Sequence, residues 1–432
     1  MKKTLLITLL LTSFFIVSGQ KPVLFCGFDH YMKMKKLHDP EFYEGYETMI
    51  RKWKSEGNSR GGGVYTLPVV FHVVYNTENQ NIPDSVVHSQ LEVLNEDYRR
   101  LNADAENTRD IFLPFAADCD IQFVLASIDP DGNPTSGITH TYTDRTEFEL
   151  QLFSQVNTLD EVKHSDDGGV DAWDTQHYIN IWICNMTTDF PGAQIFGMSY
   201  PPAGLDNWPA GSSPEDAADD GVIIHYTTVG RNNPYADEDG STENNLGRTL
   251  THEMGHYLGL RHTWGDEFFT DVCSEDDGVD DTPLCGSGDQ FTCDYEANTC
   301  DDGSGNDLPD MLENFMDYTK DACYNMFTEG QKSLMRYVID EYRYELLQPV
   351  NIPIHAVVKT QVYPNPASTI LNISIAPDAQ NTAYRIHNIT GEIVLQGNLQ
   401  STTLDISGLS TGTYLLQIDS GQSTSRSIFI VK

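Results

Sequence analysis

At 432 residues the chain is too long for one compact domain, and its 64 Asp and Glu against 26 Lys and Arg give it a net charge of −38 at pH 7. Such acidity disfavours nucleic acid and anionic membranes as partners and favours cations or basic peptides. Hydrophobic residues make up 39% of the chain, and one long apolar run lies at the N-terminus. Beyond that run we expect a soluble, globular protein.

The N-terminal apolar run is typical of an export signal. Two lysines precede "TLLITLLLTSFFIVSG", which ends in small residues. We therefore assign residues 1–19 to a cleaved secretory signal peptide, without lipid attachment because no cysteine follows the small residues directly. An uncleaved membrane anchor is the alternative, but the run is short for a bilayer span.

The next segment differs in charge from the rest of the chain. Residues 20–60 contain eight Lys or Arg and six Asp or Glu, whereas residues 61–432 contain 16 and 58. A slightly basic segment can attract a strongly acidic body, as a propeptide and its enzyme would. We assign residues 20–59 to a propeptide, which ends beside three consecutive glycines that form a flexible, protease-accessible joint.

Residues 60–348 mix strand and helix patterns and predict an α/β or α+β domain, of which we favour α+β. Strands are expected in "YTLPVVFHVVYN", "DIQFVLASID", "HYINIWICNM" and "GVIIHYTTVG". Helices are expected in "DSVVHSQLEVLNEDYRRLNA", capped by Asp84 or Ser85, in "NLGRTLTHEMGHYLGL", and in "TEGQKSLMRYVIDEYRYELL", capped by Thr328. A long stretch rich in Asp, Gly and Cys separates the last two helices, and we expect little regular structure there.

The remainder of the chain forms a different kind of unit. Residues 349–358 are expected to form a Pro-containing linker. Residues 359–432 contain no cysteine and alternate apolar and polar residues between Gly, Asn and Thr turns, for example in "TILNISI" and "TTLDISGLSTGTYLLQI". This pattern predicts a small all-β sandwich.

The stretch "THEMGHYLGLRHTW" carries histidines at the spacing of a metal site. On a helix, His252 and His256 lie one turn apart on nearly the same face, so both rings can reach one cation. Gly259 can adopt a left-handed conformation that ends the helix and turns the chain, so His262 can approach the same cation from outside. Three imidazoles leave one position of a tetrahedral Zn²⁺ open for water, which is typical of a catalytic site.

Glu253 follows the first histidine and suits a hydrolytic role. Its carboxylate can contact a water on the metal without replacing a histidine. Zinc lowers the pKa of such a water towards about 7, and Glu253 takes the proton and later returns it to the leaving amine. We therefore expect peptide-bond hydrolysis without a covalent intermediate. A helix with surface histidines is the alternative.

The string "HEMGHYLGLRH" resembles the long zinc motif of the metzincin metallopeptidases. "NFMDY", "DACYNMFT", "GLRHTWGD" and "CSEDDGVDDTP" resemble the pappalysin branch in particular, and the resemblance covers roughly residues 60–345. It implies a metzincin-type catalytic domain, with a twisted mixed sheet, an active-site helix and a loop-rich, disulfide-pinned lower part. It also implies that Met316 is the methionine of the turn beneath the metal, and that Tyr318 lies near the metal and helps to bind the tetrahedral intermediate.

The acidic loop after the histidine motif suits calcium by composition. "GDEFFTDVCSEDDGVDDTPLCGSGD" and "CDDGSGNDLPD" concentrate carboxylates, and Ca²⁺ takes 6–8 oxygen ligands. Neither stretch matches an EF-hand, so a solvated loop without metal is the alternative. The pappalysin resemblance implies structural calcium in this region, and we favour Asp280 and Asp281 as its ligands.

Cysteines of an exported chain are expected in disulfides. The resemblance implies the pairs Cys273–Cys300 and Cys293–Cys323, although the sequence alone could not choose the connectivity. Cys119 and Cys184 lie beside predicted strands and either bridge each other or remain free core thiols. Cys285 does not fit the pattern of these two implied pairs.

Cys26 is the one cysteine of the expected propeptide. A thiolate is a good zinc ligand, and one in the open position would exclude water. Several metzincins keep their zymogens latent in this way, and the resemblance implies the same here. An incidental thiol, or a disulfide partner for Cys285, is the alternative.

Asp321 lies five residues beyond Met316, in a segment that forms the wall of the S1′ pocket in metzincins. A carboxylate there would pair with Arg or Lys at P1′, and Arg suits it better because its fork can bind both oxygens. The resemblance favours this pocket, because pappalysin-type enzymes cleave before basic residues. Arg60 lies just ahead of the glycine joint, where the backbone is accessible, so we predict self-cleavage at Ser59–Arg60. A solvated loop aspartate or a calcium ligand is the alternative.

The C-terminal unit resembles the sorting domain of the type IX secretion system, through "VYPNPAS", "DISGLSTGTYLLQI" and the terminal Lys432. The resemblance implies export to the cell surface or medium, with the secretion machinery and protein substrates as partners and a monomeric mature form. A carbohydrate-binding or adhesive sandwich is the alternative for this unit. For the whole chain the competing interpretation is a calcium-stabilised surface adhesin with a non-catalytic zinc site, which an intact Glu253 argues against.

Overall fold

The structure of the chain is a computed structural model. It describes residues 23–56, 62–151, 158–189, 193–202, 217–236, 238, 244–265, 273, 275–286, 293–301, 303, 307–348, 361–374, 383–388, 393–399, 402–419 and 424–432. The chain divides into two compact units, Met1–Pro349 and Val350–Lys432. The predicted signal peptide, linker and cleavage bond Ser59–Arg60 lie outside the described residues. Within the described part, no helix is long and apolar enough to cross a membrane.

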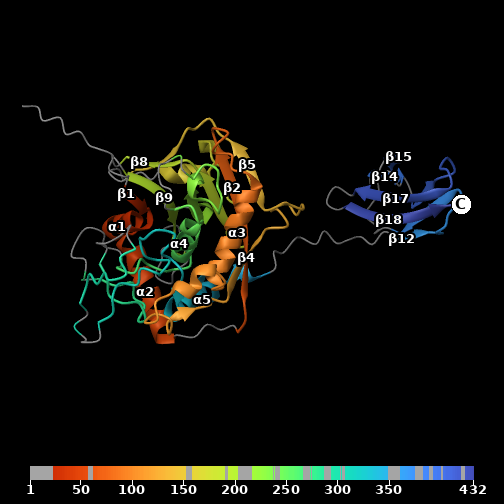
Figure 1. Ribbon diagram of the computed structural model, residues 1–432. Helices are drawn as coiled ribbons and strands as arrows, with labels where there is room; N and C mark the ends of the chain where they lie inside the picture. Colours follow the sequence, from red (N-terminus) through yellow and green to blue (C-terminus); the bar gives the residue numbers. More distant parts are fainter. Residues whose placement is uncertain are drawn as a thin grey trace, which may run out of the picture. The chain divides into compact units, whose positions relative to one another are not determined.

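The first unit is an α+β domain (Figure 1). Its helices are α1 (Phe28–His38), α2 (Pro40–Glu56), α3 (Asp84–Tyr98), α4 (Arg248–Tyr257) and α5 (Glu329–Tyr342). Its strands are β1 (Val23–Cys26), β2 (Tyr65–Tyr75), β3 (Ala116–Ala117), β4 (Ile121–Leu125), β5 (Ile138–Tyr142), β6 (Phe148–Leu150), β7 (Ile179–Cys184), β8 (Met186–Thr188), β9 (Ala193–Ser199), β10 (Val222–His225) and β11 (Phe327–Thr328). The strands and helices predicted for residues 60–348 are confirmed, whereas β3, β5, β6, β8, β9 and β11 were not anticipated.

Seven strands form the main sheet. Six of them follow the order β1-β9-β10-β7-β2-β4, and β5 pairs with the part of β2 that lies beyond β4. The pairs from β10 to β4 and β5 are parallel, whereas β9 runs antiparallel to β10, so the sheet is mixed as expected. All six residues of β7 are buried, because the continuous apolar run "INIWIC" suits a strand covered on both faces.

Helices α3 and α4 lie side by side (Figure 1) and hold the histidine motif against the sheet. The Gln90 amide of α3 donates to Gly247 O at 2.8 Å, and the Tyr98 hydroxyl donates to Thr251 O at 3.3 Å. Thr251 in turn donates to the buried Asp97 carboxylate at 2.8 Å. These bonds fix the position of α4. Helix α3 begins at Asp84 after Pro83, so the predicted cap was one residue late, while the Thr328 cap of α5 is confirmed as a capping box with Gln331.

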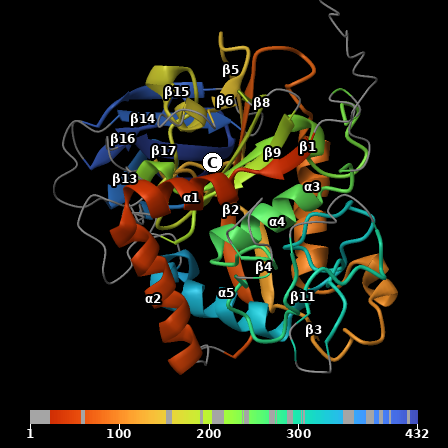
Figure 2. The same cartoon turned by 90° about the vertical axis from the view of Figure 1, so that its left-hand side faces the viewer.

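Residues 23–56, in the predicted propeptide, contain elements that their sequence did not reveal. Strand β1 pairs in parallel with β9, and Figure 2 shows the two lying along each other. Helix α2 buries one apolar face against the domain: the Tyr46 hydroxyl donates to Gly259 O at 3.0 Å and the Trp53 indole donates to Ser333 Oγ at 3.1 Å. Ion pairs join Lys54 to Asp280 and Glu47 to Arg261. The segment therefore folds as part of the first unit.

The lower part of the domain is loop-rich and pinned by disulfides. Cys273 is bonded to Cys300, and Cys293 to Cys323, which are the pairs expected from the resemblance. The free, buried cysteines are Cys26, Cys119, Cys184 and Cys285. Cys119 and Cys184 are therefore core thiols, and Cys26 is not a disulfide partner of Cys285.

The second unit is antiparallel throughout and confirms the predicted β sandwich. Its strands are β12 (Gln361–Tyr363), β13 (Ile370–Ser374), β14 (Ala383–Asn388), β15 (Ile393–Asn398), β16 (Thr403–Asp405), β17 (Gly412–Asp419) and β18 (Thr424–Val431). They form sheets in the orders β12-β13-β16 and β15-β14-β17-β18. One apolar core draws on both sheets, for example Leu371 of the first and Leu416 and Phe429 of the second.

Candidate metal centre

Helix α4 presents His252 and His256 one turn apart, as the spacing predicts. The helix ends at Tyr257, and Gly259, two residues later, has a φ of +90°, in the left-handed region expected there. The Gly259 amide donates to His256 O at 2.8 Å, and the chain then turns back. This turn brings His262, which lies outside the helix, to the same place as the other two rings.

The three histidines form a nearly equilateral arrangement. Their Nε2 atoms lie 3.1 Å from one another in all three pairs. Two nitrogens bound to a tetrahedral zinc at about 2.05 Å would be about 3.3 Å apart. The histidine geometry therefore fits zinc.

Hydrogen bonds at the other ring nitrogens fix which atom faces the centre. Each Nδ1 of His252, His256 and His262 bonds an oxygen, and the partners are Phe315 O at 2.7 Å, Leu260 O at 2.8 Å and Asp29 Oδ1 at 2.6 Å. An imidazole that donates from Nδ1 keeps the lone pair on Nε2 for a metal. Burial lowers the pKa of His252 to about 3 and the pKa values of His256 and His262 well below their ordinary value, so all three are neutral.

Cys26 completes a four-residue cluster with the histidines. Its sulfur and one nitrogen of each ring all lie within 4.8 Å of one another, and all four side chains are buried. Within the described residues this is the one group of three or more such side chains close enough to share a metal ion. The cluster brings a side chain of the predicted propeptide together with the histidine motif.

Glu253 lies beside the cluster and is 1% exposed. Its Oε2 accepts a hydrogen bond from Ser199 at 3.1 Å, and the Cys26 thiol also bonds the carboxylate. Burial raises the pKa of Glu253 to about 8, and these two hydrogen bonds act in the opposite direction. A Cβ at Gly197 of β9 would overlap the carboxylate, so this glycine gives Glu253 its space.

Gly197, Ser199 and Asp29 were missed by the sequence analysis. A glycine within an apolar strand is a known sign that another group approaches the backbone closely, and "QIFGMS" carried that signal. The contacts of Ser199 and Asp29 join segments far apart in the chain, so no local pattern pointed to them.

Tyr318 and Met316 both lie close to the histidine motif. The Tyr318 ring lies 4.7 Å from the His262 ring, between centroids, and its hydroxyl accepts from Cys26 N at 2.8 Å. Met316 is fully buried, and its sulfur lies against Gly255 of α4 so closely that a Cβ there would overlap it. The methionine therefore supports the helix from below the histidines.

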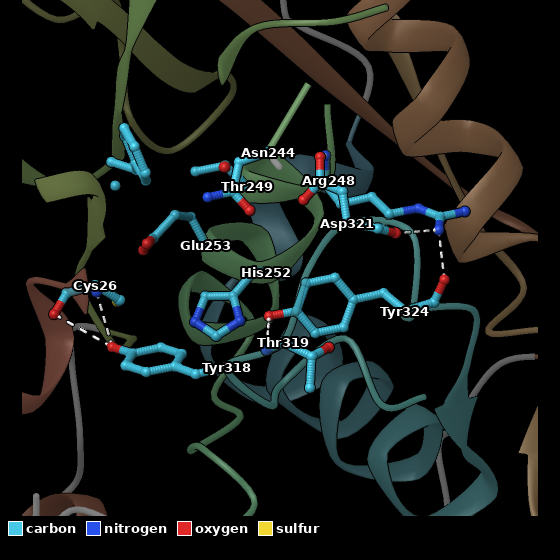
Figure 3. A pocket seen from close by; sticks show the side chains of 12 residues that line it. Cys26, Asn244, Arg248, Thr249, His252, Glu253, Tyr318, Thr319, Asp321 and Tyr324 are labelled. Atoms are coloured by element: carbon cyan, nitrogen blue, oxygen red, sulfur yellow. Dashed lines mark hydrogen bonds between the residues drawn. The ribbon is translucent and has the colours of Figure 1, made fainter. Parts of the chain in front are cut away.

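Asp321 lines the same pocket as His252 and Glu253. Figure 3 shows Cys26 and Tyr318 on one side of His252 and Asp321 on the other. Asp321 Oδ2 accepts from Leu246 N at 2.8 Å, so the carboxylate also holds the start of α4. Burial raises the pKa of Asp321 to about 6.

The two aspartates of the acidic loop that were expected to bind calcium make other contacts in the structure. Asp280 has an 88% exposed side chain and pairs with Lys54 at 2.8 Å. Asp281 accepts from the Thr328 hydroxyl at 2.6 Å and from Gly330 N at 2.8 Å, so it supports the start of α5. Asp277 differs from both: it is 2% exposed, and no atom of the described residues forms a hydrogen bond with its Oδ2.

Known proteins resemble both units. Residues 163–340 match the peptidase M43 family model, described as pregnancy-associated plasma protein-A, and residues 361–432 match the secretion system C-terminal sorting domain. The structure of a Tannerella forsythia promirolysin mutant is 37% identical and matches 74% of this chain and 96% of its own, with a TM-score of 0.62. Mature Tannerella forsythia mirolysin in complex with a cleaved peptide is 38% identical over 67% of this chain and 100% of its own, with a TM-score of 0.54. An extracellular metalloprotease of Colletotrichum graminicola is 29% identical over 64% of this chain and 77% of its own.

The histidine cluster and these matches agree on the class of protein. The chain belongs to the M43, or pappalysin, family of metallopeptidases, and its first unit has the mirolysin fold. Its C-terminal unit is a type IX secretion sorting domain, which directs the protein to the cell surface or the medium.

Proposed function

We propose that the protein is a zinc-dependent endopeptidase, made as a latent zymogen, in which His252, His256 and His262 hold the metal. The observation that carries the proposal is the triangle of neutral Nε2 atoms, each 3.1 Å from the others, beside the buried Glu253. A zinc ion held there lowers the pKa of a bound water and polarises a peptide carbonyl.

Glu253 is the general base and acid of the proposed reaction. It lies on the helix next to the first histidine, so it can accept a proton from the attacking water and pass it to the leaving amine. Ser199 holds one carboxylate oxygen in place. The Tyr318 hydroxyl accepts from Cys26 N in this structure, and once the propeptide has left, it can donate to the oxyanion of the tetrahedral intermediate.

A cleavage assay tests this proposal. Glu253→Ala should retain one zinc per chain and lose about 10²–10⁴-fold in the rate of casein cleavage, the usual contribution of a general base. His262→Ala should lose both zinc and activity. Equal casein clearing by the wild type and by Glu253→Ala would contradict the peptidase mechanism.

The latency proposal rests on residues 20–59. Cys26 stands in the metal cluster, and β1 occupies the edge of β9 beside the site. We infer self-cleavage at Ser59–Arg60, which would release Cys26 from the zinc. Solved structures exist of both promirolysin and mature mirolysin, which supports a processed enzyme here. N-terminal sequencing of the exported protein should give Arg60, and Glu253→Ala should remain uncleaved.

We also propose a preference for Arg or Lys at P1′, set by Asp321. Its carboxylate lines the pocket at the metal centre and is buried, so it can bind a guanidinium with little competition from water. Because Asp321 also caps α4, Asp321→Asn is a better test than alanine: it keeps an acceptor for Leu246 N and removes the charge. Peptide-library profiling should show a loss of cleavage before Arg with zinc retained, and a wild type without P1′ preference would refute the assignment.

Structural calcium in the acidic loop is a further proposal. The buried Oδ2 of Asp277 has no hydrogen-bond partner among the described residues, and a bound cation would supply one. The geometry favours Asp277 as a ligand over Asp280, which is exposed and paired with Lys54, and over Asp281, which supports α5.

A further inference from the structure

Residues 26–29 approach the metal centre through three different side chains. The Cys26 sulfur belongs to the metal-ligand cluster. The Phe28 ring stacks on the His256 ring, with centroids 3.9 Å apart. The Asp29 carboxylate bonds His262 Nδ1 at 2.6 Å and is 8% exposed. The segment therefore contacts two of the histidines directly, in addition to placing Cys26 in the cluster.

The Asp29 contact sets His262 apart from the other two histidines. His252 and His256 donate to main-chain carbonyls of the catalytic domain, which remain after the propeptide is cut away. The Nδ1 partner of His262 is a side chain from residues 20–59. Cleavage of the propeptide would thus remove the hydrogen-bond partner of one ligand only.

We propose that Asp29 is a positioning residue for the metal: it orients His262 and makes the zymogen hold zinc more tightly than the mature enzyme, beyond what Cys26 adds. This inference rests on the proposed zinc site and propeptide. A metal-bound histidine whose second nitrogen donates to a carboxylate is fixed in tautomer and orientation, and its ligating nitrogen is more basic. Loss of such a partner typically lowers metal affinity 10–100-fold.

The proposal has a consequence for the order of events. Zinc loading would be most favourable while residues 20–59 are still attached. Cleavage would remove Cys26 and Asp29 together, which opens the site to water and weakens the hold on His262. The rings of Trp264 and Tyr318, with centroids 4.5 and 4.7 Å from that of His262, would still contact it. The mature enzyme should therefore lose zinc to chelators more readily than the zymogen.

The test measures zinc affinity without relying on activity. Intact zymogen carrying Glu253→Gln, which prevents self-cleavage, and Cys26→Ala, which removes the thiolate, serves as the parent. Asp29→Ala and Asp29→Asn are added to it, and the zinc Kd is measured by competition with a chromogenic chelator. Asp29→Ala should raise the Kd about 10–100-fold, and Asp29→Asn should raise it less because an amide oxygen still accepts from Nδ1.

Glu47→Gln in the same parent is the matched control. Glu47 also belongs to residues 20–59, and its ion pair within the described residues is with Arg261, the residue before His262, rather than with a histidine ring. If Asp29 acts through His262, Glu47→Gln should leave the zinc Kd unchanged. Equal shifts from Glu47→Gln and Asp29→Ala would mean that Asp29 only docks the propeptide, and the inference would fall.

Each of the remaining outcomes would contradict either the inference about Asp29 or the proposed zinc site. An unchanged Kd in Asp29→Ala would overturn the inference. If Asp29→Ala fails to fold, as judged by its melting curve, the asparagine variant decides, and an unchanged Kd there would count against the proposal. A parent that binds no zinc would refute the proposed zinc site instead, so the two failures are distinguishable.

Discussion

The histidine–cysteine cluster and the acidic loop both gather side chains suited to metals, but they differ in how those side chains are held. Two of the three histidines lie on α4, and each ring has a hydrogen bond that fixes its orientation. In the loop, Asp280 points to solvent and Asp281 holds the start of α5. Spacing on a regular element therefore predicted ligand geometry, whereas composition in a loop predicted at most a kind of ion.

The largest effect on the histidine–cysteine site is expected from a substitution at Gly197. Because a Cβ at this position would overlap the Glu253 carboxylate, Gly197→Ala should displace the general base and lower kcat about 10²-fold or more, with zinc content unchanged. Gly408→Ala, at a position with nothing within 4 Å of the added carbon, is the control and should behave as the wild type. Full activity in Gly197→Ala would show that Glu253 does not need this space.

Calcium removal probes the other region. If Asp277 binds calcium, chelation with the zinc site kept loaded should lower stability by about 3 kcal/mol at a hundredfold excess of calcium over its Kd, seen as a drop of several degrees in Tm. Asp277→Asn should abolish this response, whereas Asp280→Asn should keep it. If Asp280→Asn abolished the response and Asp277→Asn kept it, Asp280 rather than Asp277 would be the ligand.

Packing under the histidines gives a smaller effect. Gly255→Ala places a methyl against the Met316 sulfur, and such overpacking costs about 1–3 kcal/mol. Met316→Ala alone leaves a cavity and costs about 2–5 kcal/mol. In the double variant the two changes compensate, so urea unfolding should show less destabilisation than the sum. Strict additivity would mean that the two side chains do not interact.

The smallest expected effect is a pH dependence of the calcium-free protein. Burial raises the pKa of Asp277 to about 8, from an ordinary value of 3.8. Between these values the unfolded chain has released the proton while the folded chain keeps it, so stability should fall as pH rises from about 4 to 8. We expect about 1–2 kcal/mol, since relaxation reduces the cost of burial. Asp277→Asn should lack this component when urea unfolding is compared across the window, and the same slope in both proteins would argue against a buried Asp277.

The parts of the site that were predictable share one physical basis. The helix, the turn at Gly259 and the third histidine follow from a fixed spacing and a conformational preference, and the Thr328 cap follows from a local hydrogen-bond motif. Met316, Tyr318 and the two disulfide pairs came from resemblance. Their placement depends on contacts between distant segments, which no local pattern encodes.

The parts that were not predictable depend on tertiary contacts. Gly197 matters because β9 passes beside α4, and Asp29 matters because β1 joins that same strand. Helix α2 forms because its apolar face is covered by the domain, and its sequence was assigned no element. In the acidic loop, burial singles out Asp277 among several aspartates that are equivalent in composition.

The central claim is that one zinc ion binds at the Nε2 atoms of His252, His256 and His262, with Cys26 as the fourth ligand of the zymogen. Anomalous X-ray scattering at the zinc edge, from crystals of the intact zymogen carrying Glu253→Gln, tests it most directly. The account predicts one strong peak at bonding distance from all three nitrogens and from the Cys26 sulfur. A peak bonded to fewer than three of these histidines, or none at the cluster in zinc-loaded protein, would contradict it.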